Sequence, residues 1–346
     1  MKFVNLWYEF GSGSFGGWRW QWRKVEKEIF RTFAGKNMQF GKWKIKDPKK
    51  AFYNDEFIKR LHSFIVEWKP SLLITMNSSS AYLGQHAMRP YRIPMIGMGH
   101  SDPENPPRRY CTEDEYDAIR ACDVFQVLLN QYVDYYRAIG CKRIVVIPNA
   151  VNQIPDNMIA DLSVEHHRIV HVGRIDGSLK RQHLLIEAFA QIAERYPEWS
   201  VHFYGNVDNC HYKKKLDEMI HKYHLDSRII FEGSKSDIPA ELRKADIFAF
   251  PSAAESFGLA LAEAMGMGVP VLAYQSCRGA SSLIENGFNG ILLKDGVEPL
   301  SQGLDRLMKD QLLRIRMGKA AHEKVKEYAP DKIWNMWEQL IESCLY

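Results

Sequence analysis

The sequence lacks several features that would point directly to particular classes of protein. Its six cysteines form no Cys-x-x-Cys pair and have no partnered histidine spacing, which argues against a zinc site and for reduced thiols. The longest apolar stretch, Phe257 to Tyr274, is interrupted by Glu263 and Pro270, so it does not predict a membrane span. The first residues reach Glu9 too soon for the apolar core of a signal peptide. We therefore expect a cytoplasmic protein.

The chain also lacks a strong excess of charge. A formal net charge of +4 is too small to argue for nucleic acid, although it suits an anionic ligand or an anionic membrane surface. A hydrophobic content of 46% and a charged content of 25% are typical of a globular protein. With 346 residues, the chain is long enough for two domains of ordinary size.

Short apolar runs alternate with helix-length segments along the first half of the chain. Such alternation predicts a parallel sheet covered by helices on both faces. The strands expected here are 2–8, 72–75, 94–97, 124–128 and 143–147, and the helices are 18–33, 55–68 and 131–139.

A turn-rich stretch at 148–166 breaks the alternation, and we interpret it as an interdomain linker. We predict an α/β protein with two doubly wound, Rossmann-like αβα domains, 1–150 and 165–329, that face a central cleft. The last helix, about 330–346, is expected to pack back on the first domain. Strands of the second domain are expected at 169–172, 200–204, 228–231, 247–250, 269–274 and 289–293.

The first motif lies between Pro251 and Met265. An expected strand ends at Phe250 and a helix begins near Gly258, so free N–H groups and the positive end of the helix dipole would face phosphate or sugar oxygens. Glu255 precedes this helix and Glu263 lies inside it, and a carboxylate can accept hydrogen bonds from vicinal hydroxyls. A glutamate near a helix start also stabilises the helix by itself, so a structural role stays open for each.

The second motif is the loop 173–181. Arg174 and Lys180 follow an expected strand that ends at Gly173. Arginine offers a planar fork of donors for phosphate oxygens, and lysine offers a compact charge. Cations held at a departing diphosphate lower the barrier more than they tighten binding. A solvated basic loop is the alternative interpretation.

Together the two motifs resemble glycosyltransferase family 4, whose members are retaining enzymes of the GT-B fold. The resemblance covers the second domain from about Val170 to Leu293. It departs from the family at Ala150 and Asn152, and at Arg278, which stands where the family usually has Gly-Gly and would either meet the donor or cap a loop. Further matches are Ile-Pro-Asn-Ala-Val-Asn at 147–152, Gly-Val-Pro-Val at 268–271 and Ile-Glu-Asn-Gly-Phe-Asn-Gly-Ile-Leu at 284–292.

The resemblance implies a donor site. Arg174 and Lys180 would bind the donor diphosphate, Glu263 the ribose and Glu255 the donor sugar. His100 matches a histidine that relatives place against the donor sugar, although a histidine after a strand is also a common structural residue. The other donor contacts that the resemblance implies are Gly173, Ser256, Phe257, Gly258, Leu259, Gly16 and Gly17, with Ser234, Lys235 and Ser236 flanking the nucleobase.

The resemblance further implies transfer of a hexose or N-acetylhexosamine from a nucleotide-diphosphate sugar to a saccharide or lipid-linked acceptor in polysaccharide or glycoconjugate synthesis. A UDP-sugar is our first expectation for the donor and a GDP-sugar the second. No Asp-x-Asp triplet occurs, and Arg174, Lys180 and the helix start can neutralise a diphosphate, so we expect no cofactor and no metal requirement. The family implies same-face attack, in which the departing phosphate takes the acceptor proton.

The segment from Trp18 to Lys24 leaves two interpretations open. It interleaves three tryptophans with three cations, a composition that suits peripheral attachment to the inner, anionic face of the cell membrane. The alternative is that Trp18 and Trp22, one helical turn apart, are core residues with solvated charges between them. Single-stranded nucleic acid also suits such a segment, but the low net charge argues against it.

Rival functions remain at this point. The fold would also suit a sugar-nucleotide epimerase or a phosphorylase, and a protein that binds carbohydrate or nucleotide sugar without catalysis. A dinucleotide oxidoreductase fits less well. Gly11, Gly13 and Gly16 match its glycine spacing, but tryptophans crowd the following helix and no acidic residue is placed about 20 residues on.

Overall fold

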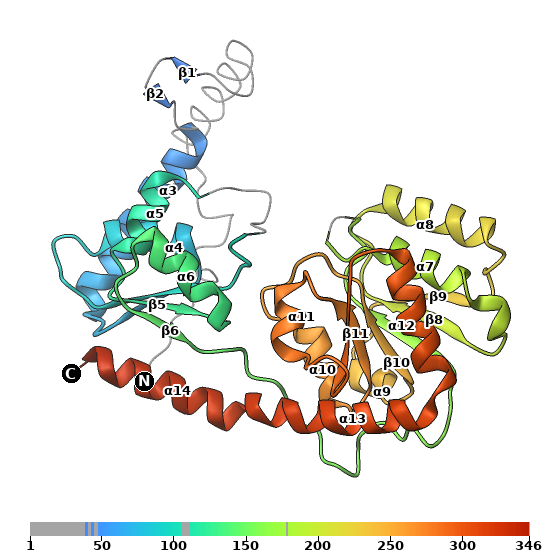
Figure 1. Cartoon of the computed structure of the whole chain (residues 1–346). Coiled ribbons are helices and arrows are strands. Elements are labelled where there is room, and N and C mark those ends of the chain that lie inside the picture. The colour runs from blue at the N-terminus through green and yellow to red at the C-terminus, as the bar shows by residue number, and fades with distance from the viewer. Residues whose placement is uncertain (1–38, 41–42, 45–47, 105–110, 178, 346) are drawn as a thin grey trace.

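The computed structural model describes residues 39–40, 43–44, 48–104, 111–177 and 179–345. These residues form two α/β domains, each built on a parallel sheet, which lie side by side (Figure 1). The predicted fold class is confirmed. The expected strand 2–8, the glycine-rich turn and the helix 18–33 lie outside the described residues.

The first domain carries a four-stranded sheet in the order β3-β4-β5-β6, with all neighbours parallel. A hairpin of two short strands, which the sequence did not predict, precedes it. Asn77 and Thr112 each begin a helix with a reciprocal capping box. The elements are β1 (Gln39–Phe40), β2 (Trp43–Lys44), α3 (Pro48–Trp68), β3 (Leu73–Thr75), α4 (Ser78–Ala87), β4 (Met95–Gly99), α5 (Glu113–Arg120), β5 (Val124–Val127), η1 (Asn130–Tyr132), α6 (Val133–Ile139) and β6 (Ile144–Val146).

The second domain carries a six-stranded parallel sheet in the order β12-β11-β10-β7-β8-β9. From β7 the chain proceeds outward through β8 to β9, and from β10 it proceeds outward the other way through β11 to β12. The order in which successive strands are added to the sheet therefore reverses between β7 and β10, which are parallel neighbours. The strands are β7 (Arg168–Val172), β8 (Ser200–Tyr204), β9 (Ile229–Gly233), β10 (Ile247–Phe250), β11 (Val271–Tyr274) and β12 (Gly290–Leu293).

Helices cover both faces of this second sheet. The apolar faces of α7, α8 and α12 bury Phe189, Leu216 and Leu304 in one core, and α9 and α10 bury Leu242 and Leu261 in another. The helices are α7 (Gln182–Ala190), η2 (Ala193–Arg195), α8 (Cys210–Lys222), α9 (Ile238–Leu242), α10 (Leu259–Gly266), α11 (Arg278–Leu283), α12 (Val297–Lys309), α13 (Gln311–Val325) and η3 (Lys326–Tyr328).

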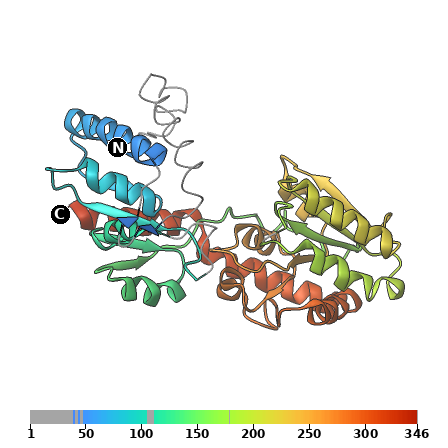
Figure 2. The ribbon, with the colours of Figure 1, turned by 90° about the horizontal axis from the view of Figure 1, so that it is seen from above.

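The last helix, α14 (Pro330–Leu345), leaves the second domain and lies along the first sheet (Figures 1 and 2). Its Ile333 and Leu340 are buried in one cluster with Ile96 and Val124 of β4 and β5. The chain therefore crosses twice between the domains, once through the irregular stretch 147–167 and once at α14. Among the described helices, none has both the length and the apolar character that crossing a membrane requires.

Candidate active site

The loops that follow β7 and β10 meet at the carboxyl edge of the second sheet. In open α/β sheets, ligands bind at the point where the strand order reverses, and here that point lies between these two strands. The backbone joins the two loops directly, because the Ala253 amide donates a 2.7 Å hydrogen bond to the Leu179 carbonyl. The relative position of the two predicted motifs is thus set by the main chain.

Lys180 and Glu255 form an ion pair at this meeting point. The Lys180 Nζ lies 2.5 Å from Glu255 Oε1, and each side chain is only 17% exposed. The ammonium also lies 5.5 Å from the centre of the Phe250 ring. An ammonium has three N–H donors, so one can hold Glu255 while the others stay available to a ligand. The structure therefore brings together a predicted diphosphate ligand and the predicted sugar carboxylate, which are 75 positions apart in the sequence.

Gly173 and Arg174 begin the same loop. The Gly173 amide donates to Tyr204 O at 2.9 Å, and a Cβ at Gly173 would lie 3.3 Å from Lys180 Cδ, so glycine leaves space for the lysine stem. The Arg174 side chain has a different environment. It is 63% exposed, and its Nη1 donates to Asp208 Oδ2 at 3.0 Å. Arg174 and Lys180, which were both predicted to bind the diphosphate, therefore lie in different environments.

The start of α10 faces the same edge of the sheet. Gly258, at the N-cap, has φ of 90°, which favours glycine, and no hydrogen bond joins the amides of Leu259 or Ala260 to another described residue. Phe257 is buried and anchors the turn, whereas Ser256 is half-buried. These amides form the kind of positive helix end at which anions bind.

Glu263 lies one helical turn beyond Leu259. Its carboxyl group is open to solvent and is hydrogen-bonded by none of the described residues. The surrounding protein nevertheless displaces part of its water, and this desolvation raises the pKa of Glu263. A carboxylate that lacks a protein partner can accept hydrogen bonds from ligand hydroxyls.

The predicted nucleobase residues Ser234, Lys235 and Ser236 follow β9, two strands away from β7. All three side chains are exposed, and the Lys235 Nζ lies 3.5 Å from Glu232 Oε2. This loop therefore belongs to the outer end of the carboxyl edge, on the side of Asp208.

His100 follows β4 of the first domain. Its Nε2 lies 3.1 Å from the side-chain oxygen of Gln126, whose amide in turn donates to Ile147 O at 2.6 Å. This arrangement places the proton on Nε2 and leaves Nδ1 as an acceptor. Burial lowers the pKa of His100, which favours the neutral ring. His100 lines a cavity of about 850 Å³ that lies mostly between the first sheet and α14, and Leu259 is the one described lining residue that comes from the second domain. The predicted Gly16 and Gly17 lie outside the described residues.

Two residues beneath the β7 loop were missed by the sequence analysis. His171 is fully buried and donates through Nδ1 to Ala249 O at 2.9 Å, and burial lowers its pKa to about 4. Gln182, also buried, donates to Arg174 O at 2.9 Å and lies 3.4 Å from His171 Nε2. The available signal was a histidine inside the otherwise apolar Ile169–Val172 run.

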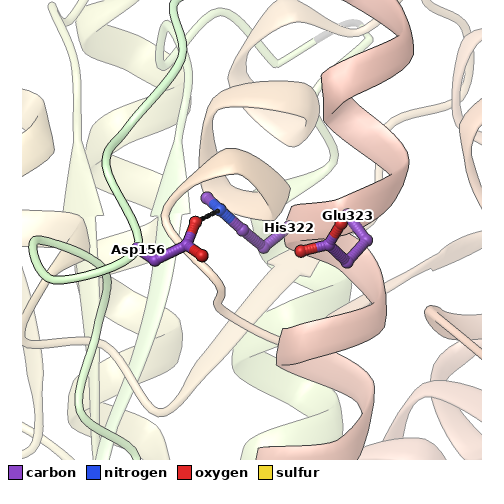
Figure 3. Close-up of side chains that lie close together, drawn as sticks. All are labelled: Asp156, His322 and Glu323. Carbon is purple, nitrogen blue, oxygen red and sulfur yellow. Dashed lines mark hydrogen bonds and ion pairs between the residues drawn. The ribbon is translucent and has the colours of Figure 1, made fainter.

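One group of described side chains could in principle hold a metal ion, namely Asp156, His322 and Glu323 (Figure 3). His322 donates through Nδ1 to Gly266 O at 2.7 Å, and its Nε2 lies 3.0 Å from Asp156 Oδ1. The Lys326 ammonium is 2.7 Å from Glu323 Oε1 and 3.4 Å from Asp156 Oδ1. Bonds from His322 and Lys326 lower the pKa of Asp156. We interpret the group as an ion-pair cluster that joins the linker to α13, at the opposite end of α10 from Gly258.

Comparison with known proteins bears on both domains. Residues 159–324 match the family model described as glycosyl transferases group 1, and residues 23–153 match the one described as glycosyltransferase family 4. The crystal structure of HepE from Anabaena in complex with UDP superposes with a TM-score of 0.71 at 20% identity, over 84% of this chain and 82% of that one. At this identity the likeness shows the fold.

Curated relatives match over parts of their length. An exopolysaccharide phosphotransferase of Streptomyces coelicolor is 29% identical over 225 residues, which are 64% of this chain and 23% of that protein. A poly(glycerol-phosphate) alpha-glucosyltransferase of Bacillus subtilis is 25% identical over 200 residues, 56% of this chain and 29% of that protein. The chain thus spans less than a third of the length of these two relatives. Because its two halves match the two glycosyltransferase family models in order on a GT-B fold, the chain belongs to glycosyltransferase family 4.

Proposed function

We propose that this chain is a retaining glycosyltransferase that transfers a hexose or N-acetylhexosamine from a UDP-sugar to a saccharide or lipid-linked acceptor. The observation that carries the proposal is the half-buried Lys180–Glu255 pair at the switch point of the second sheet. It places a cation and a carboxylate side by side, next to the free amides at the start of α10. A diphosphate bound to a sugar presents the complementary chemistry, with negative charge followed by hydroxyl groups.

The donor would span the carboxyl edge of the second sheet. Its diphosphate would lie against Lys180 and the start of α10, and charge that develops on the leaving group would be stabilised by groups already in place. Glu263 would accept from the ribose hydroxyls, and Glu255 from those of the sugar. The sugar would then point toward the hollow lined by Leu259 and His100, where the first domain contributes the acceptor side.

Four finer features belong to the same proposal. UDP as the nucleotide is supported by the UDP in the HepE crystal structure. Independence from metal is supported by the charge of Lys180 and by the α10 amides, which can neutralise a diphosphate. Same-face attack is suggested by the family, with the departing phosphate taking the acceptor proton. The setting would be the cytoplasm, at or near the inner face of the cell membrane, in synthesis of a surface polysaccharide or glycoconjugate.

The test is a panel of UDP-N-acetylglucosamine, UDP-glucose and GDP-mannose, offered with saccharide acceptors in the presence of EDTA. We expect release of free nucleoside diphosphate together with a glycosylated product, and retention of this activity in EDTA. The Glu255→Ala variant should lose turnover, whereas Lys214→Ala, at a highly exposed lysine of α8, serves as the matched control.

The rival functions give different outcomes in the same panel. An epimerase would interconvert the nucleotide sugars without releasing nucleotide, and a phosphorylase would require inorganic phosphate. A binding protein would show calorimetric heat with UDP-sugars but no turnover, and Glu255→Ala would then change affinity only. Strict loss of activity in EDTA would contradict the metal-independent site.

A further inference from the structure

Arg278, whose role the sequence left open, connects the two domains. It begins α11 in the second domain, and its guanidinium donates to Asp102 Oδ1 at 3.1 Å and to the carboxylate of Glu104, both of which follow β4 of the first domain. The Asp102 side chain is only 3% exposed, and that of Arg278 25%. Because Asp102 is buried, water screens its attraction to Arg278 less than it screens an ion pair on an open surface.

Two neighbouring residues of η1 make a second connection. The Gln131 side-chain amide donates to Arg278 O at 2.8 Å. The Tyr132 hydroxyl lies 3.1 Å from Ser256 O and 3.3 Å from Glu255 O, so its proton can be donated to either carbonyl. Tyr132 is fully buried, and burial together with the nearby Asp102 carboxylate raises its pKa, so the phenol remains a donor at every relevant pH.

The two connections converge on the same short loop. Gly279, next to Arg278, donates its amide to Glu255 O at 3.1 Å. A Cβ at Gly279 would lie 2.7 Å from that oxygen and 2.8 Å from the Phe257 carbonyl, so the two backbones touch. The main chain that carries Glu255 is therefore held from one side by α11 and from the other by Tyr132 of the first domain. Closing the domains completes this arrangement, because Tyr132 and Asp102 come from the opposite half of the molecule.

We propose that Tyr132 and Arg278 are positioning residues, which fix the Glu255 loop in its sugar-binding geometry only while the two domains are in contact. This inference rests on the proposed function. If Tyr132 withdrew, two carbonyls of the loop would lose a donor and Glu255 could leave its position beside Lys180. Separation of the domains would thereby release the sugar-binding carboxylate, while the diphosphate contacts of Lys180 and the start of α10, which belong to the second domain, would remain.

The first test separates the sugar from the nucleotide. In Tyr132→Phe, the nucleotide sugar of the panel with the highest wild-type turnover should show a kcat lowered about 10-fold, the range expected for one lost hydrogen bond at a positioned group. Affinity for UDP alone, measured by calorimetry, should change less than twofold. Arg278→Gln should lower kcat in the same way, and Arg278→Lys should restore part of it because it keeps the charge. Tyr223→Phe is the matched control, since no described residue hydrogen-bonds its hydroxyl.

The second test does not depend on turnover. Small-angle X-ray scattering should give a larger radius of gyration for Arg278→Ala than for the wild type, with unchanged circular dichroism. An unchanged radius would show that the bridge does not hold the domains and would overturn the proposal. If the radius of gyration of Arg278→Ala were larger but kcat were unchanged in Tyr132→Phe, Arg278→Gln and Arg278→Lys, the positioning role would be overturned. Absence of wild-type turnover on every nucleotide sugar would instead overturn the proposed function, and the scattering result would still decide whether the bridge holds the domains.

Discussion

The carboxyl edge of the second sheet has an inner part and an outer part, which differ in how they hold charge. The inner part, where the end of the β7 loop meets the β10 loop, holds Lys180 and Glu255 as a half-buried pair above the buried His171. In the outer part, Arg174 pairs with Asp208 in the solvent, and Lys235 lies exposed after β9. Buried charges interact at a lower dielectric constant, and buried side chains have fewer rotamers available. The side chains of the inner part are therefore already in place before a ligand binds.

This difference teaches that cations close together in sequence need not contribute equally. Arg174 and Lys180 belong to one loop, yet the first is mostly exposed and the second mostly enclosed. An exposed ion pair contributes little free energy because water and salt screen the attraction between its charges. We therefore expect changes in the inner part to affect chemistry strongly, and changes in the outer part to affect mainly binding.

The largest effect is expected for Lys180→Ala. Loss of a charged donor already aimed at the leaving group should lower kcat about 100-fold or more. The comparison of inner and outer parts would fail if this variant changed only KM. Steady-state kinetics measures kcat and KM of this variant, with Lys214→Ala as the control. Calorimetry with UDP separates loss of binding from loss of the chemical step.

Gly279→Ala is next in size and tests how tightly the inner part is packed. The new methyl group would meet Glu255 O at 2.7 Å and the Phe257 carbonyl at 2.8 Å, so the backbone must shift. We expect the free energy of unfolding of the second domain to fall by about 3 kcal/mol. In the control Gly266→Ala, the nearest side-chain atom, Val325 Cγ1, lies 3.5 Å away, an ordinary contact, so denaturant unfolding should show little change there. Equal losses in both variants would contradict a tight inner loop.

A pH dependence follows from His171 beneath the loop. Its pKa is lowered to about 4 by burial, so in acid the unfolded chain takes up a proton near pH 6.5 while the folded protein does not. Stability should therefore fall as the pH drops from 7 to 5, by about 2 kcal/mol from this group. In His171→Asn, which keeps a donor toward Ala249 O, that part of the dependence should vanish. His221→Asn, at an exposed histidine, should retain the full dependence in urea titrations.

The sequence predicted the second domain better than its site. The strands 200–204 and 247–250 were placed without error, because each is a short apolar run bounded by turns. The turn after the strand 247–250 likewise predicted a helix beginning near Gly258, within one residue of the start of α10. Such features are local, and a single stretch of sequence is enough to reveal them.

What the sequence could not reveal depends on strand order. Lys180 meets Glu255 only because β10 lies beside β7, and Arg174 turns to Asp208 because β8 lies on the other side. The contacts of Tyr132 and Arg278 in addition require two domains to come together. Neither arrangement leaves a pattern in the spacing of residues. The sequence alone therefore could not show that Arg174 pairs with Asp208 or that Arg278 contacts the first domain.

The smallest effect is expected for Arg174→Ala, which probes the outer part directly. Because its guanidinium is exposed and already paired with Asp208, a diphosphate must compete with that carboxylate, and the net gain is limited. We expect KM for the nucleotide sugar to rise about fivefold, with little change in kcat, and the rise to shrink at high salt because exposed charges are screened. Asp208→Asn is the informative partner, since it should lower KM by weakening the pairing of Arg174, whose Nη2 then keeps, among the described residues, only Asp176 Oδ2 at 3.8 Å. A loss of kcat in Arg174→Ala as large as that in Lys180→Ala would mean that the arginine leaves Asp208 and joins the inner part when the donor binds.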